Sequence, residues 1–485
     1  MTICKLQIRD EVNCKLEGLD LSTRKTLINM FKYDVPGARY QPAVRLGRWD
    51  GKVSFFQLSG ATYINLLPQI LPVLEDRGID VEIEDNRSYI TTFNFKQVTE
   101  DTFGAYAWPK GHPIAGAPIA LRDYQVKVIN DFLANPQCIQ EVATGAGKTI
   151  TTAALSYSVQ DYGRSIVIVP NKSLVVQTEE DYKNVGLDVG VYFGDRKEFN
   201  KQHTICTWQS LNNMLKNTKA GEAEVPIEDF IEDVVCVIVD EVHMAKADAL
   251  KTLLTSTFSH VPIRWGLTGT IPKEDFESQA LYVSLGPVVG HLSAAELQER
   301  GVLAQCHVNV KQLVDYTEYK TYQSELKYLL DNEDRMTYIS TMIKNISDTG
   351  NTLVLVDRIS AGQRIVEAIP DAVFVSGNTK IADRKDEYDE IATSTNKIIV
   401  ATYGVAAVGL NIPRIFNLVM LEPGKSFTRV IQSIGRGIRK AEDKDFVQIW
   451  DITSTCKFSK RHLTKRRQFY NDAKYPHTTE KVTWQ

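Results

Sequence analysis

Short apolar runs of strand length recur along the chain from about residue 119, and longer segments of helical character separate them. The runs at residues 165–169 (SIVIV) and 234–239 (VVCVIV) are continuously apolar, which is typical of strands buried on both faces of a parallel sheet. A second set of such runs lies at residues 352–356, 372–375, 397–400 and 418–421. Two sets of this kind predict two tandem doubly wound α/β domains with parallel sheets.

The N-terminal part of the chain has a different pattern. Residues 53–67 are rich in β-branched and aromatic side chains, and residues 67–74 favour a short helix in spite of Pro68 and Pro72. A Pro/Gly-rich segment at 108–118 indicates a domain boundary. We therefore predict an α+β N-terminal accessory domain at 1–110, a first α/β domain at 111–285, a linker at 286–305, a second α/β domain at 306–455 and a basic C-terminal tail at 456–485.

Composition adds three exclusions. The 485 residues include 56 Lys and Arg against 60 Asp and Glu, a net charge of −4, which excludes a uniformly basic nucleic-acid coat and leaves only local basic patches for a polyanion. The seven cysteines form no C-x-x-C pair, so a disulfide framework or a zinc site is not expected and a reducing compartment is favoured. No apolar run approaches the roughly 18 residues of a membrane helix, and the charged N-terminus does not resemble a signal peptide.

A phosphate-binding loop is the first chemical feature. Residues 142–149 (VATGAGKT) follow an apolar segment and precede a helical one. Glycines let the backbone curl around an anion, and the positive end of the following helix attracts it. Lys148 would reach the β- and γ-phosphates of ATP, and the Thr149 hydroxyl would ligate Mg²⁺. Val142 stands where the strict pattern has glycine. The candidate nucleotide-binding residues are Thr144, Gly145, Ala146, Gly147, Lys148 and Thr149.

Two acidic residues follow the apolar run 234–239 directly. A carboxylate at the carboxyl end of a parallel strand faces the crevice where ligands bind, so Asp240 is a second candidate Mg²⁺ ligand. Glu241 is placed to orient or deprotonate the attacking water. An isolated pair of this kind is usually an acidic turn, and it is the phosphate loop that favours the catalytic interpretation.

Nine segments between residues 121 and 439 occur in the order of the superfamily 2 helicase motifs, and the chain resembles that family in its DExH form. The segments are 121–125 (LRDYQ), 142–149, 169–177, 207–211 (TWQSL), 240–243 (DEVH), 267–270 (LTGT), 354–358 with 375–377, 401–413 and 432–439 (QSIGRGIR). The resemblance implies two RecA-like domains that use ATP and Mg²⁺. It also implies that Arg122 and Gln125 sense the adenine and that Gly409 shapes a loop of the nucleotide site. Asn411 stands where the family often has an acidic residue.

The last motif supplies cations from the second domain. Gln432, Arg436 and Arg439 are predicted to lie on one helix, with the two arginines three residues apart and so on one face. An arginine delivered across a domain cleft neutralises charge on the transferred phosphoryl group, which is worth about 10³–10⁵ in rate, and makes hydrolysis depend on domain closure. The alternative is a surface ladder of ion pairs.

Nucleic-acid contacts follow from the resemblance. His243, Thr268 and Thr270 would couple the phosphate site to a groove whose hydroxyls, amides and few cations suit contacts to phosphates. The groove residues implied are Lys172, Thr207, Trp208, Arg358, Ser376, Thr402 and Tyr403. Trp208 is equally compatible with a core position.

Two further segments concentrate positive charge. Residues 31–52 interleave basic and aromatic side chains, among them Arg45, Arg48 and Trp49, which suits a nucleic-acid groove with stacking or an ordinary β-hairpin. This segment resembles the N-terminal domain of phage recombination helicases that remodel branched DNA. Residues 457–467 carry six Lys or Arg and no acidic residue, which suits a solvated helix face or a nucleic-acid contact.

The predicted function is therefore that of an ATP- and Mg²⁺-dependent DNA helicase or translocase. Its expected partner is branched, forked or single-stranded DNA, in fork regression, Holliday-junction migration and the unwinding of D-loops and R-loops. RNA in hybrids and recombination or single-strand-binding proteins are further candidate partners. A monomer in the cytoplasm of a bacterial or phage-infected cell, without a membrane contact, is expected. The alternatives are the duplex-DNA motor of a restriction-like complex and a DExH RNA helicase.

Overall fold

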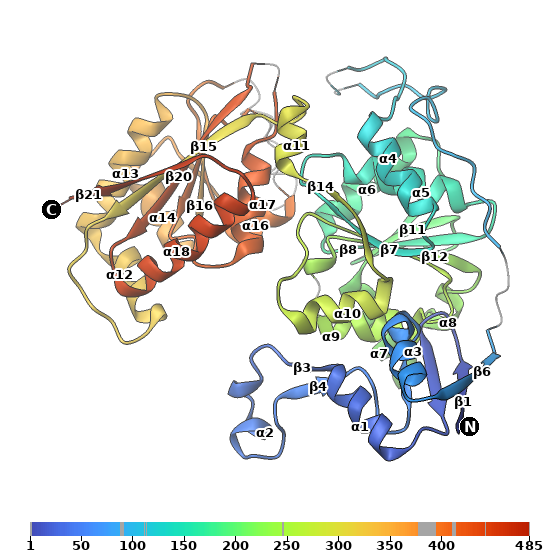
Figure 1. The fold of residues 1–485 in the computed structure, drawn as a ribbon. Helices are drawn as coiled ribbons and strands as arrows, with labels where there is room; N and C mark the ends of the chain where they lie inside the picture. Colours follow the sequence, from blue (N-terminus) through green and yellow to red (C-terminus); the bar gives the residue numbers. More distant parts are fainter. Residues whose placement is uncertain are drawn as a thin grey trace. The chain divides into compact units, whose positions relative to one another are not determined.

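The computed structural model describes residues 2–87, 92–110, 112, 114–244, 247–376, 394–409, 414–441 and 443–484. Its contacts divide the chain into two compact units, coloured mainly blue to green and yellow to red in Figure 1. The first comprises Met1–Val142 and Gly147–His291, and the second comprises Ala143–Ala146 and Leu292–Gln485.

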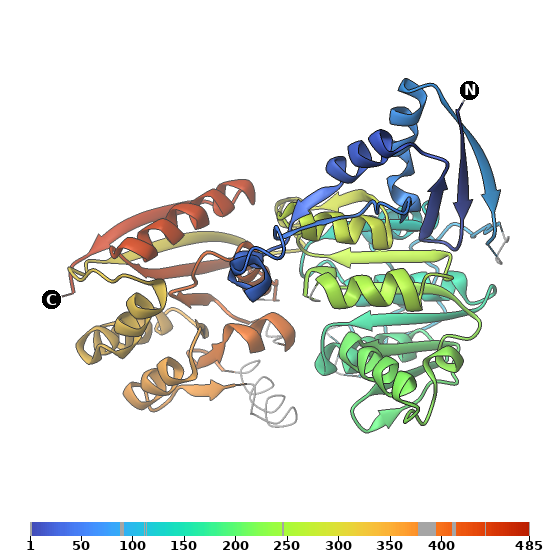
Figure 2. The same ribbon diagram turned by 90° about the horizontal axis from the view of Figure 1, so that it is seen from below.

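The N-terminal domain is a small α+β layer within the first unit. Its sheet has the order β5-β2-β1-β6, with β1 (Thr2–Ile8) antiparallel to β2 (Asn13–Glu17) and parallel to β6 (Ile79–Asp85), and with β5 (Ala61–Tyr63) at one edge. Helices α1 (Leu21–Met30) and α3 (Leu67–Asp76) lie on one side of it (Figure 2). Because Pro68 lies in the first turn, where its missing N–H is tolerated, α3 forms and continues past Pro72.

This domain shares its hydrophobic core with the first α/β domain. Phe276, Ala280 and Val283 of α10 (Asp275–Leu285) are buried in one cluster with Leu6, Leu27 and other N-terminal residues. The rings of Phe55 and Phe276 lie 5.7 Å apart. The N-terminal domain predicted at 1–110 is therefore not a separate compact unit.

A two-stranded hairpin extends from this domain. Strand β3 (Lys32–Asp34) pairs antiparallel with β4 (Lys52–Ser54). Between them lie a 3₁₀ turn, η1 (Ala38–Tyr40), and the short helix α2 (Pro42–Arg45).

The first α/β domain has an eight-stranded sheet within the described residues, with the order β10-β9-β11-β8-β12-β13-β7-β14. Neighbouring strands from β9 to β7 run parallel, and β10 is antiparallel to β9. Helices α4, α5 and α6 cover one face and α7 to α10 the other (Figure 1). The strands are β7 (Gln137–Val142), β8 (Arg164–Val169), β9 (Val189–Phe193), β10 (Arg196–Lys197), β11 (His203–Thr207), β12 (Val234–Asp240), β13 (Ile263–Thr268) and β14 (Val288–Leu292). The helices are α4 (Asp123–Leu133), α5 (Lys148–Val159), α6 (Lys172–Asn184), α7 (Trp208–Ala220), α8 (Ile227–Phe230), α9 (Ala247–Thr252) and α10.

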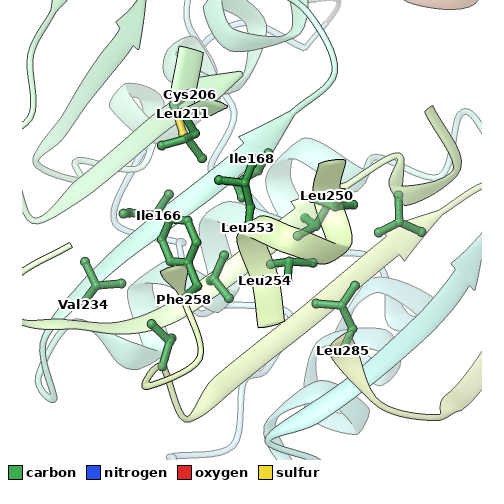
Figure 3. Close-up of a cluster of buried hydrophobic side chains, with 14 of the residues drawn as sticks. Ile166, Ile168, Cys206, Leu211, Val234, Leu250, Leu253, Leu254, Phe258 and Leu285 are labelled. Carbon is green, nitrogen blue, oxygen red and sulfur yellow. The ribbon is translucent and has the colours of Figure 1, made fainter. Parts of the chain in front are cut away.

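The core under α7 and α9 explains the continuous apolar runs. Ile166 and Ile168 of β8 and Val234 of β12 form one buried cluster with Leu211, Leu253 and other helix residues (Figure 3). Because the sheet is covered on both faces, both sets of alternating side chains are apolar at residues 166–169 of β8 and 234–239 of β12.

The second α/β domain has a sheet of seven parallel strands within the described residues, with the order β17-β18-β16-β19-β20-β15-β21. Helix α18 lies on one face and α13 and α14 on the other (Figure 2). The strands are β15 (Gln305–Leu313), β16 (Thr352–Val356), β17 (Val373–Val375), β18 (Ile398–Thr402), β19 (Asn417–Leu421), β20 (Phe446–Ser454) and β21 (His477–Val482). The helices are α11 (Ala294–Glu299), α12 (Tyr322–Asp331), α13 (Glu333–Ser347), α14 (Ile359–Ala368), α16 (Tyr403–Gly409), α17 (Phe427–Gly437) and α18 (Lys457–Asp472). Two doubly wound domains with a small α+β domain, the predicted fold class, are confirmed.

Two predicted segments differ from the structure. Residues 456–485 are not a tail, because α18 buries Leu463, Phe469 and Tyr470 and β21 pairs with β15. The linker predicted at 286–305 contains β14, which belongs to the first sheet, before α11 begins. All seven cysteines are buried and unpaired, and no helix among the described residues is long and apolar enough to cross a membrane.

Candidate active site

The phosphate loop joins β7 to α5, and α5 begins at Lys148. Gly145 (φ +92°) and Gly147 (φ +84°) both adopt the left-handed conformation that side chains disfavour. A Cβ on Gly147 would also lie 2.4 Å from Nε2 of Gln125. Glycine at 147 is therefore required twice, by the backbone angle and by the close approach of Gln125.

Gln125 links this loop to the start of α4. Its side chain is buried, and its Oε1 accepts a hydrogen bond from the Arg122 backbone N–H at 2.9 Å. Arg122 is exposed, and its guanidinium donates to the Tyr124 hydroxyl at 2.8 Å. The structure thus brings Gln125, but not the Arg122 side chain, against the loop, and adenine sensing stays a prediction.

The acidic pair lies at the carboxyl end of β12, as expected. Oδ1 of Asp240 accepts a hydrogen bond from the Glu241 N–H at 2.9 Å, and Glu241 adopts φ +51°, which turns the chain sharply at this point. Oε1 of Glu241 lies 2.7 Å from Nζ of Lys148, and the two side chains are 10% and 9% exposed. The fold therefore brings together two charges that stand 93 positions apart in the chain, in a place where burial strengthens their attraction.

A hydrogen-bonded link connects Glu241 to the LTGT segment. Nδ1 of His243 lies 2.6 Å from Oγ1 of Thr268 and 3.5 Å from Oε2 of Glu241. Because the Thr268 hydroxyl donates to the Thr270 carbonyl at 2.8 Å, it accepts from the His243 ring. The Gly269 N–H also donates to Oε2 of Glu241 at 3.4 Å. The two motifs expected to couple the phosphate site to the groove are in contact.

Asp181 is a site residue that the sequence did not suggest. It lies on α6, and its carboxylate accepts a hydrogen bond from the Thr149 hydroxyl. Burial raises the pKa of Asp181 to about 6, although the bond from Thr149 lowers it in part. No motif spacing marks this position, since the contact depends on the packing of α6 against α5.

Motif VI in the second unit departs from its predicted geometry. Gln432 is buried on α17, and the backbone of Arg436 is on the same helix, while the side chain of Arg436 lies outside the described part of the structure. Arg439 lies beyond the helix, which ends at Gly437, so the three residues do not share one helix. Nζ of Lys444 donates to the carbonyl of Gly437, the last helical residue, at 2.7 Å, and to the carbonyl of Arg439 in the turn that follows, at 2.6 Å.

Most of the predicted groove residues stand at carboxyl ends of parallel strands. Lys172 is exposed in the first turn of α6, and the Thr207 hydroxyl caps α7 by accepting from the Ser210 N–H at 3.2 Å. In the second unit, Arg358 precedes α14 and donates to Gln323 at 3.2 Å. Ser376 follows β17, Thr402 ends β18 and Gly409 ends α16. Asn411 lies outside the described residues.

Two aromatic residues serve the core instead. Trp208 packs against the cluster under the first sheet, which fits the structural alternative for this residue. Tyr403 is 4% exposed, its hydroxyl donates to the Leu421 carbonyl at 3.3 Å, and the Arg429 guanidinium covers its ring at 5.2 Å. Because the Tyr403 ring is enclosed on these sides, its predicted place in the groove is wrong.

The N-terminal hairpin exposes a mixed basic and aromatic surface. Arg45 and Arg48 are exposed, and Tyr40 is 61% exposed. Trp49 is only half-buried, but its ring N–H donates to the Lys52 carbonyl at 2.8 Å and so closes the hairpin. Tyr40 is thus more exposed than Trp49, and the Arg39 guanidinium lies over its ring at 4.7 Å and donates to its hydroxyl at 2.6 Å.

Comparison with known protein families identifies the family of this chain. Residues 118–273 match the family described as "Type III restriction enzyme, res subunit", and residues 334–441 match "Helicase conserved C-terminal domain". The chain is a superfamily 2 helicase. The family implies that this helicase uses ATP, which agrees with the phosphate loop and the carboxylates of β12.

Individual proteins resemble the helicase at low identity. It is 23% identical over 477 residues to the "ATP-dependent DNA helicase uvsW" of Enterobacteria phage T4, which covers 92% of this chain and 90% of the phage protein. Its fold matches the Type ISP restriction-modification enzyme LlaBIII bound to DNA, with TM-score 0.56, 15% identity and coverage of 76% of this chain and 32% of that one. It also matches S. cerevisiae Dbp5 bound to RNA and ADP BeF3, with TM-score 0.53, 15% identity and coverage of 74% and 90%. These structures share the two RecA-like domains.

Proposed function

We propose that this helicase hydrolyses ATP at the Lys148–Glu241 site in order to move along DNA and to remodel branched DNA. The observation that carries the proposal is the contact of Lys148 with Glu241 (2.7 Å), which lies beside the His243–Thr268 link (2.6 Å). These groups provide charge neutralisation, water activation and a connection from the phosphate site to a second motif. The uvsW match, which covers 92% of this chain, supports DNA as the substrate.

The residues present fit ATP and Mg²⁺. Two left-handed glycines shape the loop, the Lys148 ammonium can neutralise phosphate oxygens, and oxygen ligands for Mg²⁺ are available from Thr149 and Asp240. Bound Mg·ATP supplies the phosphoanhydride bond to be cleaved. The Thr149 hydroxyl donates its proton to Asp181, so its lone pairs stay available for a cation.

The remaining residues act on water and on charge. Glu241 is the carboxylate that orients the attacking water and takes its proton. Arg436 and Arg439 of the second unit are the cations proposed to neutralise the transferred phosphoryl group. His243 links Glu241 to Thr268. A change at Glu241 during hydrolysis is thereby transmitted through Thr268 to the nucleic-acid groove.

The hairpin is the proposed contact for branched substrates. Arg45 and Arg48 can contact phosphates while Tyr40 offers a stacking surface. Deleting residues 1–110 would not test this role cleanly, because Phe55 packs on Phe276 of the first α/β domain. Point substitutions in the hairpin avoid this loss of core.

The experiment is a substrate panel of single strand, fork, three-way and four-way junction, scored for both ATP hydrolysis and unwinding. We expect Arg45→Gln/Arg48→Gln to reduce unwinding of forks and four-way junctions more than ATP hydrolysis stimulated by single strands. The matched control is Lys216→Gln/Lys219→Gln, which removes two exposed charges from α7 of the same unit. Equal loss of both activities in the hairpin variant would show that the hairpin is merely structural.

A second candidate is a duplex-DNA translocase of the restriction-enzyme kind, which the match of residues 118–273 favours. Such a motor would move on linear duplex without separating strands. A strand-displacement assay on forked and linear DNA separates the two functions, and competition between DNA and RNA for stimulation of ATP hydrolysis tests an RNA helicase.

A further inference from the structure

Helix α18 carries two sets of charges with different surroundings. On its inner side, Nε and Nη2 of Arg466 donate to the two carboxylate oxygens of Asp451 at 2.8 and 2.9 Å, and Nη1 donates to the Gly424 carbonyl at 2.7 Å. At the start of the helix, Glu325 accepts hydrogen bonds from the Ser459 N–H at 2.7 Å and its hydroxyl at 2.8 Å. Arg466 is thus paired with a carboxylate of β20 and holds α18 to the sheet, while Glu325 of α12 holds the start of α18.

The outer side carries cations without such partners. Lys457, Lys460, Arg461 and Thr464 are exposed and recur at helical spacing, so they form one face. No ion pair joins the three cations to a carboxylate anywhere in the described part of the chain. They line an open cavity of about 530 Å³.

The lining of this cavity also includes an exposed aromatic residue. Tyr316 is 81% exposed and follows the end of β15. Asp315 beside it turns its carboxylate inward, to Nε of Arg335 at 3.3 Å and to the Ser454 hydroxyl at 2.6 Å. Glu318 is the exposed carboxylate that the lining does contain. The cavity therefore combines three cations, one anion and an accessible ring.

The cavity lies at the carboxyl edge of the second sheet, the same edge that carries the predicted groove residues of the second unit. Since all seven strands run parallel, the ends of β15 and β20 lie at the same edge as Arg358, Ser376 and Thr402. Strand β15 is three places from β16, which at about 4.8 Å per strand is about 14 Å. About four nucleotides at 3.4 Å per nucleotide span this distance.

We propose that Lys457, Lys460, Arg461 and Tyr316, the α18 surface, bind one DNA strand after it leaves the motif residues of the second sheet. The cations contact the phosphodiester backbone, and a base stacks on the Tyr316 ring. This inference rests on the proposed function, since it extends the path of the same strand.

The test compares two pairs of charges on one helix. Lys460→Gln/Arg461→Gln removes two cations from the cavity, and Lys465→Gln/Arg467→Gln removes two exposed cations that do not line it. Affinity for a single-stranded oligonucleotide is measured at several salt concentrations. With about 0.7 in slope per phosphate contact, we expect the cavity pair to reduce the slope of log K against log[salt] by about 1.4, and the control pair to leave it unchanged.

Each result has one meaning. An equal reduction in both pairs would show a general charge effect and overturn the proposal, and so would an unchanged slope in the cavity pair, as expected if the surface serves an acidic protein segment instead. ATP hydrolysis without DNA should stay unchanged in both pairs. If the unsubstituted helicase shows no DNA-stimulated hydrolysis, the proposed function fails, whereas normal stimulation with an unchanged slope removes only the α18 surface.

Substitution of the ring separates stacking from charge. Tyr316→Ala should weaken oligonucleotide binding at least about fivefold without changing the salt slope, and Tyr316→Phe should restore it. Full affinity in Tyr316→Ala would overturn the stacking contact.

Discussion

Two buried ion pairs, one in each unit, show how differently this chain uses buried charge. In the second unit, Arg466 makes three hydrogen bonds to Asp451 and Gly424, and Asp451 accepts a fourth from the Tyr470 hydroxyl at 2.7 Å. In the first unit, Lys148 meets Glu241 at 2.7 Å, but the contact is not aligned as a hydrogen bond. A fully bonded pair fixes the fold, whereas the Lys148 ammonium, which meets Glu241 only as an ion pair, stays available to a ligand.

The largest expected effect on stability comes from breaking the fully bonded pair. Arg466→Met leaves the Asp451 carboxylate buried without a counter-charge, so the free energy of unfolding should fall by about 3–5 kcal/mol. Denaturant titration measures it. Lys465→Met, an exposed neighbour, should change stability by less than about 0.5 kcal/mol. A loss below about 1 kcal/mol in Arg466→Met would contradict the claim that the Arg466–Asp451 pair fixes the fold.

Removing the first unit's cation should act on catalysis instead. Lys148→Ala takes away the charge that faces the phosphates, so DNA-stimulated ATP hydrolysis should fall by about 10²–10³-fold. Its stability loss should be smaller than that of Arg466→Met, because Glu241 keeps the Gly269 N–H and the His243 ring nearby. Steady-state hydrolysis and denaturant titration of the same preparation check both halves. If Lys148→Ala lost as much unfolding free energy as Arg466→Met while its folded fraction stayed active, the Lys148–Glu241 pair would be structural and not catalytic.

A buried histidine extends the comparison to neutral groups. His203 on β11 is fully buried beside the Ser165 hydroxyl at 2.7 Å, and burial lowers its pKa to about 4. Because the unfolded chain binds this proton near pH 6.5, the stabilisation is present above that pH and is lost as pH falls toward 4, by up to about 3 kcal/mol. His203→Gln should reduce the steepness of the unfolding free energy against pH in this window. An unchanged pH dependence would show that His203 is not held neutral.

The smallest effect is expected at the link between motifs. His243→Ala removes the contact to Thr268, so stimulation of ATP hydrolysis by DNA should fall by about 5- to 150-fold, the range of typical coupling energies. Hydrolysis without DNA should change little. Thr268→Val should have a similar effect, and the double variant should be no worse than either single one. Additive losses would show that the two residues act separately.

The sequence predicted most of the sheet framework because buried parallel strands leave a direct signal. The apolar runs 165–169, 234–239 and 352–356 correspond to β8, β12 and β16. Motif spacing also brought Lys148 and Glu241 to one site. These predictions succeed because they depend on local patterns of apolar residues and on the order of the motifs along the chain.

Other features depend on packing that no local pattern reports. The charges of residues 457–467 suggested a tail, although Leu463 and Arg466 face the sheet and only the outer cations are solvated. Tyr403 was expected in the groove but lies under Arg429. Asp181 contacts Thr149 only because α6 packs beside α5, so a contact across 32 positions was not visible in the sequence.

The most direct test of the account is ATP hydrolysis by Glu241→Gln with saturating single-stranded DNA. The amide keeps the size of the side chain but cannot take a proton from water. We expect ATP and DNA binding to persist while hydrolysis falls by about 10²–10⁴-fold relative to the unsubstituted helicase. Normal turnover in Glu241→Gln would contradict the assignment of this site.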